Sequence, residues 1–399
     1  MKKNVSIGYL IGAVVLAVVL TFNITYVIVW HAFSGRINNL AARELTYSKL
    51  AEISTYMDKF YIGRYDEKKL LESTSGGYVK ALEDLSSYYL TKEEVYSRRM
   101  GADHGYTSIG ILSCYDAENG GIRILRMLEG SPALQQGLAV LDSIVTIDGV
   151  PVASIGYEAA LEKLRGEEGT EVAVTVLREA TGERFHVVLR RGAVVTDAFV
   201  DSRLLDGRIG YIQIPNFSEG ITEAFTAALH SLQAQGMEKL VIDLRFNPGG
   251  YMDEMCAVAE QFLSEGQTIY QERDHSGAVE AYRAHGTAED LPIAVLMDSY
   301  TAGGAEFFAA ALKENGCAML VGSKTAGMGY AQSSIELSDG SELVLSTSEY
   351  LTAGGKSLHG VGLAPDIEAQ ADIARLYAVL TQEDAADEQL EEAIKALDS

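Results

Sequence analysis

The chain has few of the residues that carry metal, redox or nucleic-acid chemistry. Its 399 residues include only three cysteines, Cys114, Cys256 and Cys317, and no C-x-x-C pair, which excludes the usual zinc-ribbon and dithiol redox motifs. Neither H-E-x-x-H nor G-x-x-x-x-G-K-[ST] occurs, so the sequence predicts no metal site and no cofactor. Lys and Arg number 32 against 56 acidic residues, for a net charge of −24, and this balance argues against nucleic acid as a partner.

Long apolar runs are also scarce, and only one could cross a bilayer. No charged residue lies within Ile7–Trp30, and at about 1.5 Å per residue a helix of this length spans a hydrocarbon core of about 30 Å. Lys2 and Lys3 precede it, which predicts a cytoplasmic N-terminus. A cleaved signal peptide would have a shorter apolar region and a small-residue cleavage site. We therefore expect an uncleaved single-pass anchor at the cell membrane, with the bulk of the chain extracytoplasmic.

The segment around residue 300 predicts a strand, a tight turn, a helix and a second strand. Ile293–Met297 is typical of a buried strand, and the glycines of Tyr300–Gly304 indicate a turn. Glu306 would lie in the first turn of the following helix, which suits the helix dipole. Ala318–Val321 is the second strand. A turn of this kind brings backbone N–H groups to the positive end of a helix, where oxyanion holes are often built.

Thr301–Glu306 and Thr325–Gln332 resemble the catalytic segments of the C-terminal processing peptidases, which are tail-specific serine proteases with a Ser–Lys dyad. The family patterns S-A-S-A-S-E and T-F-G-K-G-x-V-Q correspond to T-A-G-G-A-E and T-A-G-M-G-Y-A-Q here, at the same spacing. The nucleophile position is therefore Gly303 and the base position is Met328. Of the family's catalytic residues only Gln332 is kept. The resemblance implies a peptidase scaffold that lacks its dyad.

The phrase DLRFNPGG, Asp243–Gly250, resembles the family's L-D-L-R-x-N-P-G-G loop. It follows a predicted buried strand, and ligands of open α/β sheets bind at that end of a strand. In the family one of these glycines and the residue after the nucleophile supply the oxyanion-hole amides, which implies Gly249 or Gly250 together with Gly304. A tight turn into a helix over Met252–Leu263 would explain the loop by itself, but the neighbouring catalytic segments favour the inherited site.

Residues 104–192 resemble a PDZ domain. The phrases G-S-P-A, G-L and D-S-I-V-T-I-D-G follow one another in that family's order, and a helix over Tyr157–Leu164 would form one wall of a peptide groove. The strand on the other wall offers an edge to which a peptide can add. The loop that receives a peptide's terminal carboxylate corresponds to Ser108, Ile109, Gly110 and Ile111. Ser108 replaces the usual Gly, which leaves the affinity open.

Another nucleophile could replace the missing one. Ser299 lies four residues and Thr301 two residues before Gly303, but each would need an adjacent general base. Lys324 is expected to be solvated. The seven histidines are dispersed along the chain, at His31, His104, His186, His230, His275, His285 and His359. A relocated dyad therefore stays as the alternative interpretation.

Together these observations predict an α/β protein with an N-terminal transmembrane helix, a helical segment, a mostly β PDZ domain and an α/β peptidase-type core. The predicted boundaries are 1–34 for the cytoplasmic start and anchor, 35–103 for the helical segment, 104–192 for the PDZ domain, 193–372 for the core and 373–399 for an acidic C-terminal helix. Two functions follow from the resemblance. One is a non-catalytic scaffold or regulator that binds peptides or protein C-termini, with a homodimer as one possible assembly. The other is an active serine-type endopeptidase with a relocated nucleophile.

Overall fold

The computed structural model describes residues 16–18, 20–21, 23, 25, 44–84, 86–103, 107–128, 130–194, 199–286, 288, 291–371 and 387–398. The chain forms two units, Met1–Leu70 and Leu71–Ser399. Most of the predicted anchor, Ile7–Trp30, lies outside the described residues and stays a prediction. Within the described part, no helix has both the length and the apolar character needed to span a membrane.

The segment between the predicted anchor and the PDZ domain is mainly helical, as predicted. A helix covers residues 44–60, and α2 (Glu67–Lys80) and α3 (Lys92–Asp103) follow it. The expectation that this segment is entirely helical is wrong at β1 (Tyr88–Leu90), which pairs antiparallel with a distant strand, Tyr88 opposite Val344. Pairing to a sheet edge overrides the local preference of so short a segment.

The PDZ domain is built on one antiparallel sheet in the order β3-β4-β5-β7-β8, with β6 added to β5. Its core contains the fully buried Ile109, Ile122 and Ile144. The predicted helix over Tyr157–Leu164 is present with those bounds as α6. The elements are β2 (Thr107–Ser108), β3 (Ile111–Asp116), β4 (Gly121–Met127), α4 (Pro132–Gln135), β5 (Ser143–Ile147), β6 (Val150–Pro151), α5 (Val152–Ile155), α6, β7 (Glu171–Leu177), β8 (Arg184–Arg190) and β9 (Gly192–Ala193).

The α/β domain contains a sheet in the order β10-β11-β12-β15-β16-β19, in which only the edge strand β10 is antiparallel to its neighbour. Its strands are β10 (Asp201–Leu205), β11 (Ile209–Gln213), β12 (Lys239–Asp243), β15 (Ile293–Met297), β16 (Ala318–Gly322) and β19 (Ile367–Glu368). The helices are α7 (Ile221–Ala234), α8 (Met252–Ala259), α9 (Gly304–Glu314) and α11 (Glu388–Leu397). The chain therefore alternates strands and helices as the sequence predicted.

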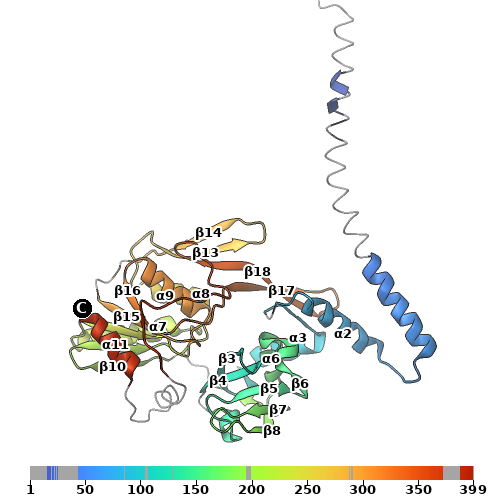
Figure 1. Cartoon of the computed structure of the whole chain (residues 1–399), viewed down its shortest axis with the longest axis horizontal. Coiled ribbons are helices and arrows are strands. Elements are labelled where there is room, and N and C mark those ends of the chain that lie inside the picture. Colours follow the sequence, from blue (N-terminus) through green and yellow to red (C-terminus); the bar gives the residue numbers. More distant parts are fainter. Residues whose placement is uncertain are drawn as a thin grey trace, which may run out of the picture. The chain divides into compact units, whose positions relative to one another are not determined.

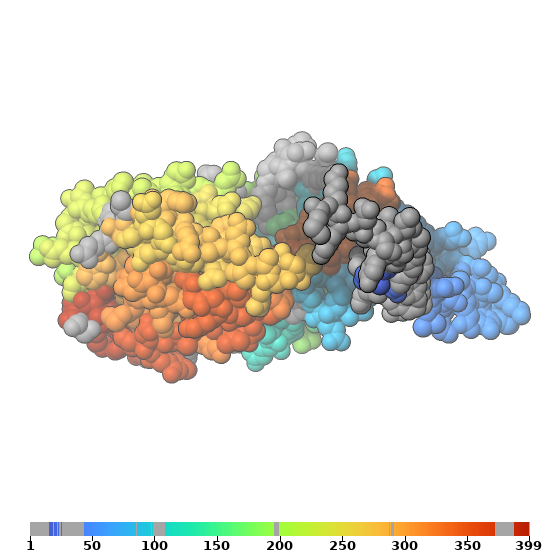
Figure 2. Space-filling model, turned by 90° about the horizontal axis from the view of Figure 1, so that it is seen from above, coloured from blue at the N-terminus to red at the C-terminus, as the bar shows by residue number. Residues whose placement is uncertain are grey.

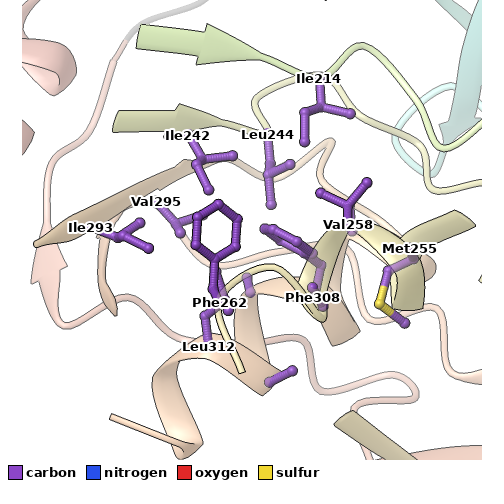
Figure 3. Close-up of a cluster of buried hydrophobic side chains, with 14 of the residues drawn as sticks. Ile214, Ile242, Leu244, Met255, Val258, Phe262, Ile293, Val295, Phe308 and Leu312 are labelled. Atoms are coloured by element: carbon purple, nitrogen blue, oxygen red, sulfur yellow. The ribbon is translucent and has the colours of Figure 1, made fainter. Parts of the chain in front are cut away.

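The strands of this sheet and the helices α7, α8, α9 and α11 lie together in the α/β domain (Figure 1), and alternate side chains of the strands belong to two separate hydrophobic cores. Ile242 and Val295 belong to the core beneath α7, α8 and α9, whereas Val241 and Leu296 belong to a second core beneath α11. Figure 3 shows side chains of the first core, where Ile242, Leu244 and Val295 face Phe262 and Phe308. Burying each such side chain contributes about 1.5–3 kcal/mol. The predicted helix after Met252 ends at Ala259, and Phe262 and Leu263 then turn into this core.

A second sheet lies beside the first and carries part of the site. Its order is β1-β18-β13-β14, and β17 pairs with β18. The strands are β13 (Thr268–Asp274), β14 (Val279–Arg283), β17 (Tyr330–Glu336) and β18 (Glu342–Thr352). A hairpin turn at Asp339-Gly340-Ser341 joins β17 to β18. In Figure 2 the surface of the α/β domain is coloured from yellow-green to red, and the exposed strand β14 contributes to its yellow-to-orange part.

Candidate active site

The nucleophile position, Gly303, lies in the turn between β15 and α9. Its φ of 52° and ψ of −126° belong to a region that favours glycine. A Cβ placed on Gly303 would nevertheless have room, at 3.7 Å from the Pro248 carbonyl oxygen and 3.9 Å from Gly249 Cα. Another residue here would be strained by about 1–3 kcal/mol but not sterically excluded. A strained turn from a strand into a helix is also how the nucleophile elbow of α/β hydrolases is built.

The fully buried Glu306 holds the two dyad positions together. Its carboxylate accepts hydrogen bonds from the amides of Gly303 (3.0 Å), Gly327 (2.8 Å) and Met328 (2.8 Å), and from the Thr325 hydroxyl. Burial raises the pKa of Glu306, and these hydrogen bonds oppose the shift. One side chain thus fixes the backbone of the nucleophile position relative to that of the base position.

The glycine loop after β12 packs directly on the Gly303 turn, since a Cβ on Gly249 would lie 3.0 Å from the Gly304 amide nitrogen. The Gly249 amide already donates to Asn247 Oδ1 at 2.8 Å. The amides of Gly250 and Gly304, by contrast, have no hydrogen-bond acceptor among the described residues. Of the three glycines predicted for the oxyanion hole, Gly250 and Gly304 are therefore the pair that could bind a developing negative charge.

Gly303 and Met328 line one cavity of about 560 Å³, together with Gly250, Gly304 and Gln332. The family positions of the nucleophile, the base and the glutamine therefore lie at one cavity. The Gln332 side chain is exposed, and its Nε2 donates to the Tyr330 carbonyl oxygen at 3.0 Å. The chain supplies neither a hydroxyl group at position 303 nor an amine at position 328.

The two alternative nucleophiles differ in accessibility. Thr301 is fully buried; its Oγ1 donates to the Leu244 carbonyl oxygen (2.9 Å) and accepts from the Asp298 amide (2.9 Å). It is not available for attack. Ser299 is exposed and lines an adjoining cavity of about 560 Å³. Lys324 is exposed, as expected.

His359 is the residue of this site that sequence spacing missed. It lines both cavities and stacks on Tyr330, with 3.6 Å between the ring centroids. No hydrogen bond joins His359 to Ser299 within the described chain. His359 comes from the segment after β18, 56 residues beyond Gly303 (359 − 303), and only the tertiary fold brings the two into one cavity.

Asp298 stabilises the turn by accepting hydrogen bonds from its backbone amides. It is buried, at 2% exposure, and its Oδ1 accepts from the amides of Phe246 (3.2 Å), Tyr300 (2.9 Å) and Thr301 (2.9 Å). Its Oδ2 has no hydrogen-bond partner among the described residues. Burial raises the pKa of Asp298 to about 6, although the amide hydrogen bonds and Arg245 oppose the shift.

This shift predicts a pH-dependent stability. The ordinary pKa of an aspartate is 3.8, so between about pH 4 and pH 6 the unfolded chain loses a proton that folded Asp298 keeps. The contribution of Asp298 to the free energy of unfolding therefore falls as the pH rises through this window, by roughly 3 kcal/mol at most. Asp298→Asn keeps the oxygen acceptor and removes the charge.

We expect the urea midpoint of Asp298→Asn, relative to that of the wild type, to rise from about pH 4 to about pH 6 and then to level off. Asp206→Asn, at an exposed turn residue, is the matched control. If the difference in urea midpoint between Asp298→Asn and the wild type does not change with pH, the pKa of Asp298 is not raised in the folded protein.

The PDZ groove lies between β3 and α6. The amides of Ile109 and Gly110, in the predicted carboxylate loop, donate to no acceptor among the described residues, while Ser108 pairs with Gly192. At the other end of the groove the Tyr157 hydroxyl donates to the Ser113 carbonyl oxygen on β3 at 2.7 Å. The loop therefore has free donors, and Tyr157 crosses the groove to the strand that a bound peptide would extend.

An α/β domain in which a glycine turn and a glycine loop bring two unbonded amides to one cavity, joined to a domain that resembles a PDZ domain, is the arrangement expected of PDZ-containing serine peptidases. The sequence profile of Peptidase family S41 matches residues 208–369, and that of the PDZ domain matches residues 100–177. The chain belongs to peptidase family S41. The resemblance to C-terminal processing peptidases is thereby confirmed.

Two relatives and one solved structure illustrate the match. The carboxy-terminal processing protease CtpA of Bacillus subtilis (strain 168) is 30% identical over 332 residues, which is 83% of this chain and 70% of that protein. A probable CtpA-like serine protease of Staphylococcus aureus (strain COL) is 30% identical over 370 residues, 92% of this chain and 73% of the relative. The photosystem II D1 C-terminal processing protease superposes with a TM-score of 0.64 at 26% identity, covering 84% of this chain and 90% of its own.

Proposed function

We propose that this protein is a membrane-anchored, non-catalytic member of peptidase family S41 that binds peptides or protein C-termini as a scaffold or regulator. The observation that carries the proposal is the pair of residues at the dyad positions. Gly303 has no hydroxyl group, and Met328 has no amine. The surrounding architecture is retained, since Glu306 binds both segments and the Gly250 and Gly304 amides are free.

The second candidate is an active endopeptidase with a relocated nucleophile. It is favoured by one observation, that the exposed Ser299 and His359 line the same cavity. A serine nucleophile requires a base within hydrogen-bonding reach. Because the described residues show no such bond for Ser299, and because Thr301 is buried, the non-catalytic function has the stronger support.

Binding of a free C-terminus tests the proposed function. The full chain in detergent is titrated with a fluorescent peptide that ends in a free apolar residue, and with the same peptide as its C-terminal amide. We expect the amide to bind about tenfold more weakly, because it loses charge-assisted hydrogen bonds to the Ile109 and Gly110 amides. A Tyr157→Phe variant should bind the free acid at least as well as the wild type does. In this variant the Ser113 carbonyl oxygen no longer accepts from the Tyr157 hydroxyl and is open to the amide of a bound peptide. Equal affinity for acid and amide would mean that the loop does not read the carboxylate.

The proposed anchor has a separate test. Lys2, Lys3 and the uncharged Ile7–Trp30 support an outside location for the rest of the chain. Protease added to intact cells should therefore remove the PDZ and α/β domains, while a cytoplasmic marker protein stays intact. Protection of these domains until the membrane is permeabilised would contradict the proposed topology.

A further inference from the structure

Glu158, in the first turn of α6, faces a cleft formed by two adjoining cavities. One cavity is lined by Tyr115 and Tyr157 of the PDZ domain, and the other by Gly303 and Gly304 of the α/β domain. Because five residues line both cavities, the two form a continuous cleft from the PDZ groove to the nucleophile position. The shared residues are Ser86, Glu158, Met328, Tyr330 and His359.

The Glu158 carboxylate lacks a partner. No hydrogen bond or ion pair to it occurs within the described residues, whereas Glu162, one turn later on α6, pairs with Arg165. Burial raises the pKa of Glu158, the charge of Arg165 opposes the shift, and Glu162 adds to it. Glu162 Oε2 is itself buried without a hydrogen-bond partner. Glu158 thus has no donor among the described residues, and Glu162 keeps one oxygen without a donor although its other oxygen pairs with Arg165; removing carboxylates from water is costly unless they are paired.

The charges around the cleft have one sign. Four of the described lining residues are acidic, none is Lys or Arg, and His359 is the single imidazole; the acidic ones are Glu83, Asp84, Glu158 and Asp253. Glu83 and Asp253 are exposed, and Asp84 already accepts from the Ser86 amide and the Ser87 hydroxyl. Glu158 is therefore the lining carboxylate whose interactions a ligand would have to complete.

We infer that the cleft takes a peptide carrying a Lys or Arg side chain, and that the cation of that side chain pairs with Glu158. The inference rests on the proposed peptide-binding function and specifies its ligand. A basic side chain would supply the donors and the charge that Glu158 lacks. An apolar side chain would leave the partly buried carboxylate unpaired, and an acidic one would be repelled, so the site discriminates against both.

A lysine scan tests this inference on the full chain in detergent. The probes are fluorescent nine-residue peptides of alanine and serine with a free C-terminal valine. One set carries lysine at each position in turn, and the other carries norleucine, which has a similar apolar stem without the cation. We expect lysine to bind about tenfold more tightly than norleucine at one or two adjacent positions, since close charge pairs of this kind contribute at least this much.

Three variants test whether Glu158 causes the preference for lysine over norleucine. Glu158→Gln should abolish the lysine preference while its affinity for the norleucine peptides stays at the wild-type value, which also shows that the variant is folded. Glu223→Gln, on the exposed face of α7, should keep the preference. Equal binding of both peptide sets by the wild type, a preference that persists in Glu158→Gln, or one that disappears in Glu83→Gln instead would each overturn this inference and leave the peptide-binding function standing. Failure to bind any peptide would overturn both.

Discussion

Replacing Gly303 by Ser and Met328 by Lys together should produce a peptidase that cleaves unfolded casein, whereas we expect no measurable cleavage by the native protein. In a Ser–Lys dyad the nucleophile and the base act as a unit, so loss of either removes nearly all covalent catalysis. An oxyanion hole and substrate binding alone leave roughly 10³–10⁴-fold acceleration over water in a well-studied triad enzyme. Such a rate is too slow for a proteolysis assay, and we expect the native protein and Gly303→Ser alone to be inactive.

The expected gain in the double variant follows from what the site keeps. A serine Cβ at position 303 has room beside Pro248, and Glu306 fixes the backbone at both dyad positions. Met328 lines the cavity beside Gly303, where lysine, of similar length, could follow the same path. An amine there must be neutral to accept a proton; desolvation in the cleft lowers the pKa of a lysine, and the carboxylate of Glu158, which lines the same cavities, opposes this shift.

Gly303→Ala/Met328→Lys is the matched control, because it introduces the same backbone strain and the same amine without the hydroxyl group. A serine-directed fluorophosphonate should label the Ser/Lys variant and neither the control nor the native protein. An inactive Ser/Lys variant would mean that more than the dyad has been lost. Cleavage by the native protein that disappears in Ser299→Ala would instead establish the relocated nucleophile.

The sequence predicts this site well wherever local spacing determines geometry. The strand, turn and helix around Gly303 are set by apolar and glycine patterns, and the loop before Met328 returns to them because Glu306 binds its amides. The sequence does not show that the Gly249 amide is already bonded and so unavailable to a ligand. That depends on the Asn247 side chain, whose oxygen accepts from this amide within the same loop. His359 could not be placed at all, because no periodicity connects it to the catalytic segments.

The same distinction applies to the fold. The bounds of α6 follow from its helical pattern, and the apolar face of α11 is evident in Leu390, Ile394 and Leu397. The sequence does not say which sheet α11 covers. The sequence also does not show that Arg245, which the family-like phrase presents only as part of a turn, pairs with Asp387 at the start of α11. Long-range ion pairs between buried groups leave no periodic signal.

Arg245 joins the glycine loop to the C-terminal helix. Its side chain is 1% exposed. The guanidinium donates to Asp243 Oδ1 from Nε at 3.0 Å, and from Nη1 to Asp387 Oδ1 at 2.8 Å and Gln389 Oε1 at 3.1 Å. Asp387 is the N-cap of α11 and also accepts from the Leu390 amide at 3.1 Å. One side chain thereby neutralises two carboxylates and fixes the start of α11.

Arg245→Met should therefore be strongly destabilising. It leaves the fully buried Asp243 without a counter-ion, and removing one partner of a buried ion pair costs about 3–5 kcal/mol. Asp387→Ala should cost less, about 1–3 kcal/mol, because it removes the helix cap and one acceptor while Arg245 keeps Asp243. Urea unfolding followed by circular dichroism measures both losses, and Arg184→Met, at an exposed position of β8, is the control.

Because α11 covers Val241, Leu296 and Val321, limited proteolysis of Arg245→Met should cut first at the C-terminal helix. A loss of stability no larger than that of Arg184→Met would show that the hydrophobic contacts of α11, and not this ion pair, hold the helix on the sheet.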